Sequence, residues 1–582
     1  MSNKLKSSKA PNRFDSIIAD LDRANGYPST KHQLDIYRAI NSRDAGNILV
    51  EGVAGSSKST TIRNSLQFLP AWSKNIILAF NLHIANAMKA SGLPSHTTAG
   101  TLNSVCFRAV LGARGKDLPK PTMEKWKTYD ILRAVTKRAE DKIVEEIAEQ
   151  SRILRAAATA NNNAAVEEEY AILTQLELKE RALVDCASPI AKIVSLLKGQ
   201  SLGGADEESI LYLVDRFGVD WNPVWLPLVI ETYETSMDQR EIMDFDDQLL
   251  FSMDDACKFE QFDNIFVDES QDLNQLNLDI IAKMARLGTK NPARVIFVGD
   301  RNQSIYGFRG ADPRAIAEIR DRFQTKCLPL NVSWRCGKNI IKAAQIIVPQ
   351  IEAAPNAVDG EIISIMQADF ASTVQDGDYV LCRITSPLIS QCLRLLAKGR
   401  KAVVLGREIG ASLTAVLKKF ETPEYDGLEL MDKITYYQQL ELGRIAGNDV
   451  RSQSKVTMIV DKCDALRAIC EECSTIPQAR IKIDMIFADQ STRGITFSTI
   501  HKAKGLEADR IFIIRPDLMP LPQAKLEWER EQEMNLVYVA TTRARHSLFY
   551  VTQPKPSKHE GKSSSDVHTG RRDDNPQADT RF

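Results

Sequence analysis

The chain has 582 residues, more than one hydrophobic core supports, so we expect two to four domains. Its 75 Lys and Arg residues are balanced by 76 Asp and Glu residues, and this net charge of −1 excludes a uniformly basic nucleic-acid-coating protein. Ten scattered cysteines and the lack of any apolar run near about 18 residues argue against a disulfide-rich secreted domain and a membrane span, and favour a soluble intracellular protein.

The two ends differ from the rest of the chain. Residues 1–13 form a polar, basic arm and residues 553–582 a polar tail without periodicity, so we expect both to be disordered. Between them, short β-rich apolar runs alternate with amphipathic helical stretches, which is typical of parallel α/β sheets. The expected strands are residues 47–50, 76–80, 264–267, 294–298, 379–382, 402–405 and 510–514.

Two mainly helical segments interrupt this alternation. The first contains expected helices at 127–155 and 164–197, followed by a break at 199–204. The second has Pro423 and Gly427 in an early turn and Gly443 and Gly447 in a later one. Each is interpreted as an insertion into a sheet domain. The expected first domain is residues 14–105 and 236–325 with the insertion 106–235, and the expected second is 326–410 and 489–552 with a reduced insertion 411–488.

The string NILVEGVAGSSKSTTI predicts a phosphate-binding loop, because a glycine-containing loop joins an apolar strand to a helix. Backbone N–H groups and the helix N-terminus would hold phosphates, Lys58 would reach the β and γ oxygens, and Ser59 would bind Mg²⁺. The expected nucleotide-binding residues are Gly52, Val53, Ala54, Gly55, Ser56, Ser57, Lys58, Ser59 and Thr60. The alternative is a chance Gly/Ser/Lys loop.

Ser57 stands where the usual loop pattern has its second glycine. If the turn requires a positive φ there, a serine costs strain of about 1 kcal/mol. We therefore expect nucleotide binding to be retained and question the rate of turnover.

The string DESQD ends an apolar run and predicts the second half of a phosphoryl-transfer site. Asp268 would complete the Mg²⁺ site with Ser59, and Glu269 would orient or deprotonate the attacking water. Gln271 and Gln303, the latter in VGDRNQSIYGFRGA, are candidate reporters near the γ-phosphate. The alternative for Glu269 is a helix-capping carboxylate.

Five strings in order resemble the UvrD/Rep/PcrA-type superfamily 1 helicases over most of residues 28–552. They are the phosphate loop, DESQD, VGDRNQSIYGFRGA, STIHKAKGLEADRIFI and EMNLVYVATTRAR, and DFDDQLL before the DE strand is also similar to the family. The resemblance implies two RecA-like P-loop motor domains with parallel sheets, each interrupted by a mainly helical insertion. It also implies ATP and Mg²⁺ as cofactors and single-stranded DNA as the track.

The resemblance further assigns roles at matching positions. Gln33 resembles the adenine-binding glutamine, with an ordinary polar helix residue as the alternative; Trp334 stands where an aromatic stacks on adenine, and Glu507 resembles the glutamate on the ribose. Gln303 resembles the γ-phosphate sensor, and Arg335 and Arg543 resemble arginines that stabilise the γ-phosphoryl group when the domains close. Ser333 and Cys336 depart from the family pattern beside Arg335.

The same resemblance implies a single-strand track across both domains. Aromatic side chains in YGFRGA would provide a stacking platform, while ordinary core packing is the alternative for such a pair. The expected nucleic-acid contacts are Phe80, Asn81, Thr101, Asn103, Tyr306, Phe308, Arg309, Thr499 and His501.

Three cysteines lie close together in the sequence and include a CxxC pair, a pattern also found at zinc and iron–sulfur sites. Cys463, Cys470 and Cys473 lack a nearby fourth ligand, and their spacing predicts one packed helical face instead of a zinc or iron–sulfur site.

The leading interpretation is an ATP-dependent DNA helicase that moves 3′→5′ on single-stranded DNA and unwinds duplex; the polarity is implied by the resemblance alone. The alternatives are a translocase that displaces bound proteins, and a nucleotide-switched DNA-binding protein with slow hydrolysis. We expect it at single/double-strand junctions in the cytoplasm of a bacterial or phage-infected cell, or otherwise inside a cell with DNA. The tails are candidate contacts for loading, replication or repair proteins, and no membrane partner is expected.

Overall fold

The computed structural model describes residues 13–79, 81–115, 119–184, 186–200, 202–305, 307, 314–445, 450–488, 494–522, 524 and 527–553. The predictions of disorder for residues 1–13 and 553–582 therefore fall almost wholly outside the described residues. None of the described helices is long and apolar enough to cross a bilayer.

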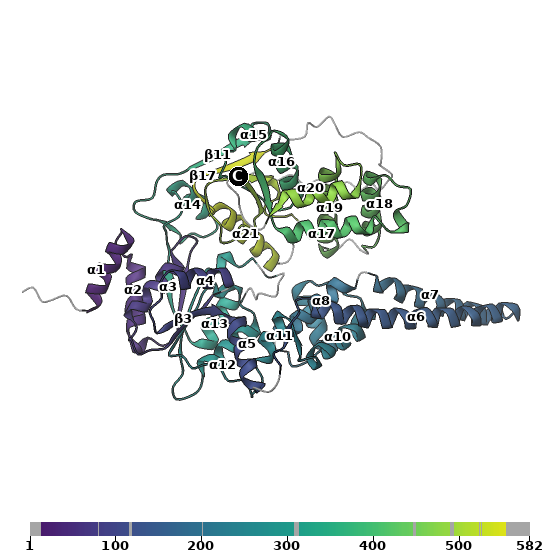
Figure 1. Cartoon of the computed structure of the whole chain (residues 1–582), viewed down its shortest axis with the longest axis horizontal. Helices are drawn as coiled ribbons and strands as arrows, with labels where there is room; N and C mark the ends of the chain where they lie inside the picture. Colours follow the sequence, from purple (N-terminus) through teal and green to yellow (C-terminus); the bar gives the residue numbers. More distant parts are fainter. Residues whose placement is uncertain are drawn as a thin grey trace, which may run out of the picture.

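The first half of the molecule is built on a six-stranded parallel sheet (Figure 1). Its strand order is β3-β2-β6-β7-β1-β8. The strands are β1 (Ile48–Gly52), β2 (Asn75–Ala79), β3 (Thr97–Thr101), β6 (Asn264–Val267), β7 (Arg294–Gly299) and β8 (Lys326–Leu330). Alternate side chains of these strands enter two separate apolar cores. One core contains α2 (Lys31–Asn41) and α3 (Lys58–Ser65), and the other contains α5 (Leu102–Ala113), α12 (Gln275–Ala285) and α13 (Ala315–Phe323).

Two boundaries expected for this half were wrong. Strand β8 was assigned to the second domain, but it pairs with β1 along its whole length, from Ile48↔Lys326 to Gly52↔Leu330. Its Pro329 cannot donate to a neighbouring strand, which the sheet tolerates because β8 lies at the edge. Helix α5 was assigned largely to the first insertion, yet it starts where β3 ends and packs on the sheet.

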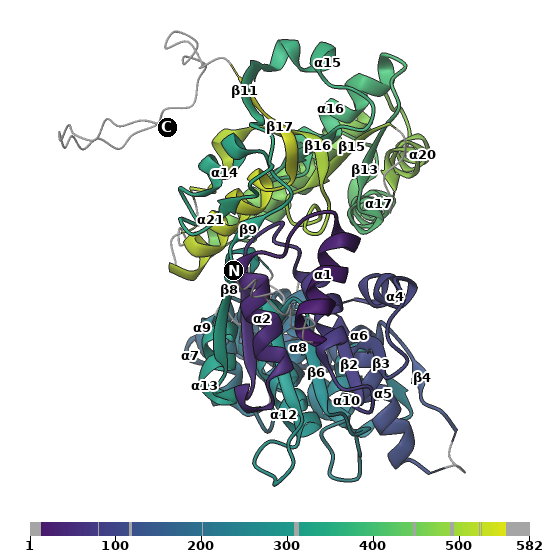
Figure 2. The same cartoon turned by 90° about the vertical axis from the view of Figure 1, so that its left-hand side faces the viewer.

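The second half contains a seven-stranded parallel sheet in the order β11-β17-β16-β12-β15-β13-β14. The strands are β11 (Glu361–Met366), β12 (Tyr379–Cys382), β13 (Ala402–Leu405), β14 (Phe487–Ala488), β15 (Ile495–Thr499), β16 (Ala508–Ile514) and β17 (Ala544–Thr552). Residues 487–488 had been expected inside a helical insertion, but they pair with β13. Figure 2 shows the two sheet domains stacked one above the other.

The first insertion is a helical body with its own apolar core. It consists of α6 (Lys127–Thr159), α7 (Asn163–Leu183), α8 (Ala187–Gly199), α9 (Glu207–Phe217) and α10 (Leu226–Asp238). In Figure 1, α6 and α7 lie side by side and project far from the sheets. The single helix expected at 164–197 is two helices. Pro189 has no backbone N–H, so a helix accepts it only in the first turn, and α8 accordingly begins at Ala187.

The helices of the second insertion share one core with the second sheet instead of forming a separate body. They are α17 (Arg407–Lys419), α18 (Leu430–Gly443), α19 (Val450–Cys470) and α20 (Ile476–Ile486). Cys463 and Cys470 are buried in that core, as expected for packed thiols. Cys473 lies beyond the end of α19, so the expectation of three cysteines on one helix was wrong.

A buried ion-pair network joins the first insertion to the first sheet domain. Lys127, at the start of α6, lies 2.7 Å from Asp247, and Lys198, near the end of α8, lies 2.7 Å from Asp247 and 2.9 Å from Asp244. Both lysine side chains and Asp247 are at most 1 % exposed. Asp244 and Asp247 also form the capping box of α11 (Phe245–Phe251), so one cluster fixes three helices.

Replacing Asp247 by Asn should destabilise the protein by about 3 kcal/mol, because two buried ammonium groups would share only one carboxylate. The midpoint of urea unfolding, with the slope held constant, measures this change. The matched control is Asp141→Asn, which breaks the exposed Lys137–Asp141 pair (66 % and 60 % exposed) and should leave the midpoint unchanged. Equal effects of the two variants would contradict the role assigned to the network.

Candidate nucleotide site between the two sheet domains

The loop after β1 has the geometry of a phosphate cradle. It runs from Gly52 to Ser57, and α3 begins at Lys58. The Lys58 ammonium donates to the carbonyl oxygens of Gly52 at 3.2 Å and Val53 at 3.3 Å, so it folds back over the loop. The hydroxyl of Ser56 is buried without a hydrogen-bond partner in the described structure. An oxyanion in the loop would satisfy that hydroxyl and draw the ammonium toward it.

Ser57 adopts the left-handed conformation, with φ 63° and ψ 37°. Strain was expected at Ser57 if the turn required a positive φ at this position, and the turn does require it. A glycine would adopt this φ without a steric cost. Gly55 also has a positive φ of 70°, and a Cβ there would lie 2.6 Å from both Arg335 Cβ and Ser333 Oγ. Only glycine allows the second domain to approach the loop this closely.

The acidic residue after β6 meets the first residues of α3. The Ser59 hydroxyl donates to Asp268 Oδ2 at 3.3 Å. Burial, assisted by the neighbouring charge of Glu269, raises the pKa of Asp268 to about 7. A hydroxyl and a carboxylate oxygen beside a phosphate cradle suit Mg²⁺, which prefers oxygen ligands and bound phosphates. Thr60 follows in the first turn of α3.

Glu269 is not a helix cap. It precedes a short 3-10 turn (Ser270–Asp272), but its side chain makes no capping hydrogen bond. Instead the Gln271 amide donates to its carboxylate, and Lys504 Nζ lies 3.9 Å away. Burial alone would raise its pKa, but the charges of Lys504 and Lys58 outweigh burial and lower it. The carboxylate is therefore kept anionic, as a base toward water requires.

Lys504 was not among the expected site residues, although it stands in the string IHKAKGLE. It crosses from the second domain, donating to Asp272 Oδ2 at 2.6 Å and to the carbonyl of Gln303 at 2.7 Å. Its side chain is only 8 % exposed. Its place in a string that resembles the family could have identified Lys504 as a site residue. Only the fold shows that its acidic partners are Glu269 and Asp272.

The expected sensor Gln303 lies in the short turn after β7. Its amide donates to Asp300 Oδ2 at 2.7 Å, and the backbone N–H of Asp300 donates to Gln271 Oε1 at 2.9 Å. The two glutamines predicted as reporters are thus joined through Asp300, which the sequence argument did not single out.

Arg335 and Glu507 form an ion pair in this structure. Arg335 Nη1 also donates to the carbonyl of Thr542 at 3.2 Å. Arg543 is 2 % exposed and donates to the carbonyls of Val539 at 3.0 Å and Leu506 at 3.1 Å. Burial lowers the pKa of this guanidinium to about 10. Its charge also helps to lower the pKa of Glu269, so Arg543 belongs to one electrostatic site with that carboxylate.

The two residues expected at adenine already have partners. Gln33 is buried and forms a capping box with Thr30, whose N–H donates to Gln33 Oε1 at 2.9 Å. That bond gives Gln33 a structural task, while its amide nitrogen makes only a 3.5 Å contact with Thr61. The Trp334 ring stacks on Tyr27 with centroids 4.0 Å apart, and its backbone N–H donates to Gly55 O at 2.8 Å.

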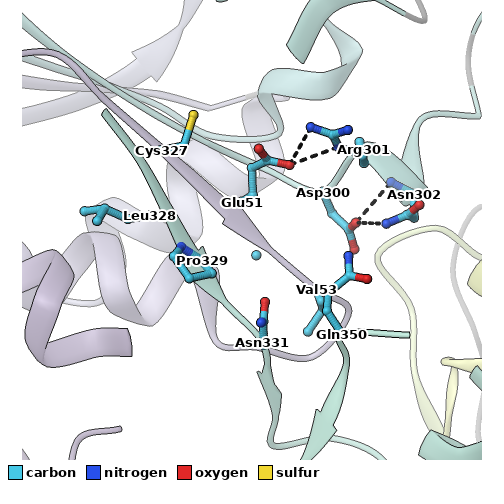
Figure 3. A pocket seen from close by; sticks show the side chains of 11 residues that line it. Glu51, Val53, Asp300, Arg301, Asn302, Cys327, Leu328, Pro329, Asn331 and Gln350 are labelled. Atoms are coloured by element: carbon cyan, nitrogen blue, oxygen red, sulfur yellow. Dashed lines mark hydrogen bonds and ion pairs between the residues drawn. The ribbon is translucent and has the colours of Figure 1, made fainter. Parts of the chain in front are cut away.

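A hollow of about 260 Å³ lies beside the loop, between β1, β8 and the turn after β7 (Figure 3). Its lining includes Glu51, Val53, Asp300, Arg301 and Gln350, with Glu51 and Arg301 paired across it. Neither Lys58 nor Ser59 lines it, and it is smaller than the usual ligand pocket of at least about 300 Å³. It therefore adjoins the phosphate cradle and is a separate space.

Comparison with known proteins agrees with this geometry. Residues 34–324 match the UvrD/REP helicase N-terminal domain, and residues 461–554 match the UvrD-like helicase C-terminal domain. The chain belongs to the UvrD-like helicase family. Its two parallel sheets are accordingly RecA-like motor domains, as the strings had predicted.

Relatives of this UvrD-like chain include fungal and bacterial proteins. It is 27 % identical over 322 residues to F-box DNA helicase protein 1 of Schizosaccharomyces pombe, covering 50 % of this chain and 34 % of that protein. It is 25 % identical over 294 residues to ATP-dependent DNA helicase srs2 of the same species, covering 47 % of this chain and 30 % of that protein. It is 21 % identical over 471 residues to ATP-dependent DNA helicase PcrA of Staphylococcus epidermidis, covering 60 % and 64 %. The matches thus span from about a third to under two thirds of these relatives.

Of the nucleic-acid contacts expected in this UvrD-like chain, Phe80, Tyr306, Phe308 and Arg309 lie outside the described residues. The others lie at carboxyl ends of strands. Asn81 caps α4 (Leu82–Ala90), Thr101 caps α5, and β2 and β3 are neighbours with Ala79 opposite Thr101. The amide of Asn103 donates to Phe245 O at 2.8 Å. In the second domain, Thr499 ends β15 and His501 lies in the following turn.

Replacing Ser57 by Gly should raise the free energy of unfolding by about 0.5 to 1 kcal/mol, because the release of left-handed strain exceeds the added flexibility of the unfolded chain. Thermal or urea unfolding measures the gain. Ser57→Ala keeps the Cβ that causes the strain and should give no such gain. A glycine variant no more stable than the alanine variant would contradict the strain.

Proposed function

We propose that this chain is an ATP-dependent DNA helicase that moves 3′→5′ along single-stranded DNA and separates duplex strands. The observation that carries the proposal is the convergence of both motor domains on one phosphate loop. Ser333, Trp334 and Arg335 contact Gly55 from the second domain, and Lys504 reaches the acidic residues of the first. A site divided in this way couples nucleotide state to the distance between the domains.

In the proposed mechanism, the backbone from Gly52 to Thr60 holds the phosphates and Lys58 leaves its carbonyl partners to contact the β and γ oxygens. Ser59 and Asp268 would hold Mg²⁺, which offsets the charge that develops on the phosphates. Glu269 would orient the attacking water and accept its proton. Arg335 and Arg543 would stabilise charge on the γ-phosphoryl oxygens after domain closure.

Adenine recognition is proposed for Gln33 and Trp334, and ribose recognition for Glu507. Trp334 is close to the loop through its bond to Gly55, while Glu507 must exchange Arg335 or Arg545 for the ribose. Aromatic stacking on adenine would replace the present contact between Trp334 and Tyr27.

The proposed DNA track crosses the carboxyl ends of β2, β3 and β15. Asn81 and Thr101 each begin a helix at neighbouring positions of the sheet edge, and helix N-termini favour phosphates. Thr499 and His501 would extend the track into the second domain. We further propose that the protein acts inside a cell on DNA with a single-stranded segment.

Two alternatives are tested against this proposal. The first is a translocase that displaces proteins without useful unwinding, which the reduced second insertion suggested. The second is a nucleotide-switched binding protein with slow hydrolysis, which Ser57 suggested. Streptavidin displacement compared with forked-duplex unwinding separates the first from the leading proposal. Phosphate release with and without single-stranded DNA separates the second.

The variant Lys58→Ala should reduce DNA-stimulated phosphate release by at least about 100-fold, the range found when a group that stabilises the transition-state charge is removed. Steady-state phosphate release at saturating ATP measures the loss. Lys398→Ala, at an exposed helix end of the second domain, should retain the parent rate. Normal turnover by the Lys58 variant would refute the site assignment.

Strand displacement on 3′-tailed, 5′-tailed and blunt duplexes tests competence and polarity together. The proposal predicts ATP-dependent displacement on the 3′-tailed substrate only, because the enzyme must load on a single strand and move toward the junction. Preference for the 5′ tail would reverse the proposed polarity. Failure on all three substrates, together with streptavidin displacement, would favour the translocase.

A further inference from the structure

Helix α21 (Glu527–Thr541) belongs to the second domain but contacts the phosphate site of the first. Figures 1 and 2 show it at the boundary between the two sheets. The side-chain amide of Asn535 donates to the carbonyls of Ser304 at 3.0 Å and Arg301 at 3.4 Å. Tyr538 lies three residues later, hence on the same face of the helix.

The hydroxyl of Tyr538 joins two loops of the first domain. It accepts a hydrogen bond from the backbone N–H of Ala54, in the phosphate loop, at 2.8 Å. It donates to Asp300 Oδ2 at 3.4 Å. Tyr538 and Ala54 are both 0 % exposed, so the Ala54 N–H has no water to replace the tyrosine hydroxyl. Burial and the charge of Asp300 raise the pKa of Tyr538 well above its ordinary value, and the hydroxyl therefore keeps the proton that it donates.

Further hydrogen bonds connect Tyr538 with two groups of the proposed site, Gln303 and Arg543. Asp300 accepts the amide of Gln303 at 2.7 Å, which links Tyr538 to the proposed γ-phosphate sensor. On its own helix, Tyr538 O accepts the hydroxyl of Thr542 at 2.8 Å, and Arg543 donates to Val539 O at 3.0 Å. The proposed catalytic arginine is thus held just beyond the end of the helix whose tyrosine contacts the phosphate loop.

We propose that Tyr538 is a positioning residue for ATP hydrolysis: its hydroxyl fixes the distance between the phosphate loop, the sensor turn and the helix end that carries Arg543. The inference rests on the proposed function and deepens it. It requires no contact between Tyr538 and the nucleotide. Its effect is on the arrangement of groups in the transition state, and so on kcat more than on nucleotide affinity.

The variant Tyr538→Phe removes the hydroxyl and keeps the ring in its apolar surroundings. We expect kcat for DNA-stimulated hydrolysis to fall about tenfold, equivalent to about 1.4 kcal/mol in the barrier, while the Kd for a fluorescent ADP analogue changes less than twofold. The matched control is Tyr37→Phe. Tyr37 is equally buried and its hydroxyl also accepts one hydrogen bond, from Asn64 at 3.4 Å, but it lies within the first domain. Its kcat should stay within twofold of the parent.

A double-variant cycle with Asp300→Asn separates positioning from general packing. If Tyr538 acts through Asp300, the doubly substituted protein should lose little more kcat than the more affected single variant. Fully additive losses, an unchanged kcat in Tyr538→Phe, or a loss confined to nucleotide affinity would each overturn the inference.

The outcomes also distinguish this inference from the proposed function. A parent protein that does not hydrolyse ATP overturns both. If the parent hydrolyses ATP and Tyr538→Phe does so at the same rate, only the role of Tyr538 is overturned. If Tyr538→Phe does not fold, Asn535→Ala removes the neighbouring contacts of the same helix face, and an unchanged kcat in that variant overturns the inference.

Discussion

The contact between Gly55 and the Ser333–Arg335 segment is the constraint on which the site depends. The second domain contacts the phosphate loop where a Cβ would lie 2.6 Å from its nearest neighbours, so any other residue would force the loop or the Ser333–Arg335 segment to move. Lys504 and Tyr538 rely on that approach to reach the first domain. Each then forms a hydrogen bond or ion pair that is buried or partly buried. The candidate site is thus divided between two domains, and an apolar cluster that includes Val53 and Ala54 of the first and Tyr538 of the second brings its parts together.

The fold class followed from local pattern, because parallel strands buried on both faces form continuous apolar runs. The pattern did not identify β3, β8, β11, β14, β15 and β17, and for β8 and β3 the sequence itself shows the reason. Pro329 makes β8 look unlike a strand, yet an edge position accepts it. In β3, the sequence TTAGT has too little apolar character to stand out. The helix boundaries depend on capping residues and on Pro189. The effect of Pro189 is local, so the start of α8 can be predicted from the sequence.

The residues of the candidate site were likewise predicted only in part. Residues to which the motifs gave a proposed chemical role, such as Lys58, Ser59 and Asp268, lie together in the structure. Lys504 and Tyr538, whose hydrogen bonds cross between the domains, were not predicted, since partners such as Tyr538 and Ala54 are 484 positions apart. The left-handed backbone of Ser57 was predicted only as a condition. The φ of a residue depends on the conformation of the whole turn. The replacement of a glycine by Ser57 therefore does not by itself show whether the turn keeps a positive φ.

The buried lysines at the base of α6 have a mechanical consequence for the helical arm. Because Lys127 is fixed at the first residue of a 33-residue helix, the arm behaves as a lever about 50 Å long, pivoted at the edge of the first motor domain. A tilt of about 10° at that pivot displaces the far end by about 9 Å on this length. Small domain motions at the phosphate loop would therefore be amplified at the distal end of the arm.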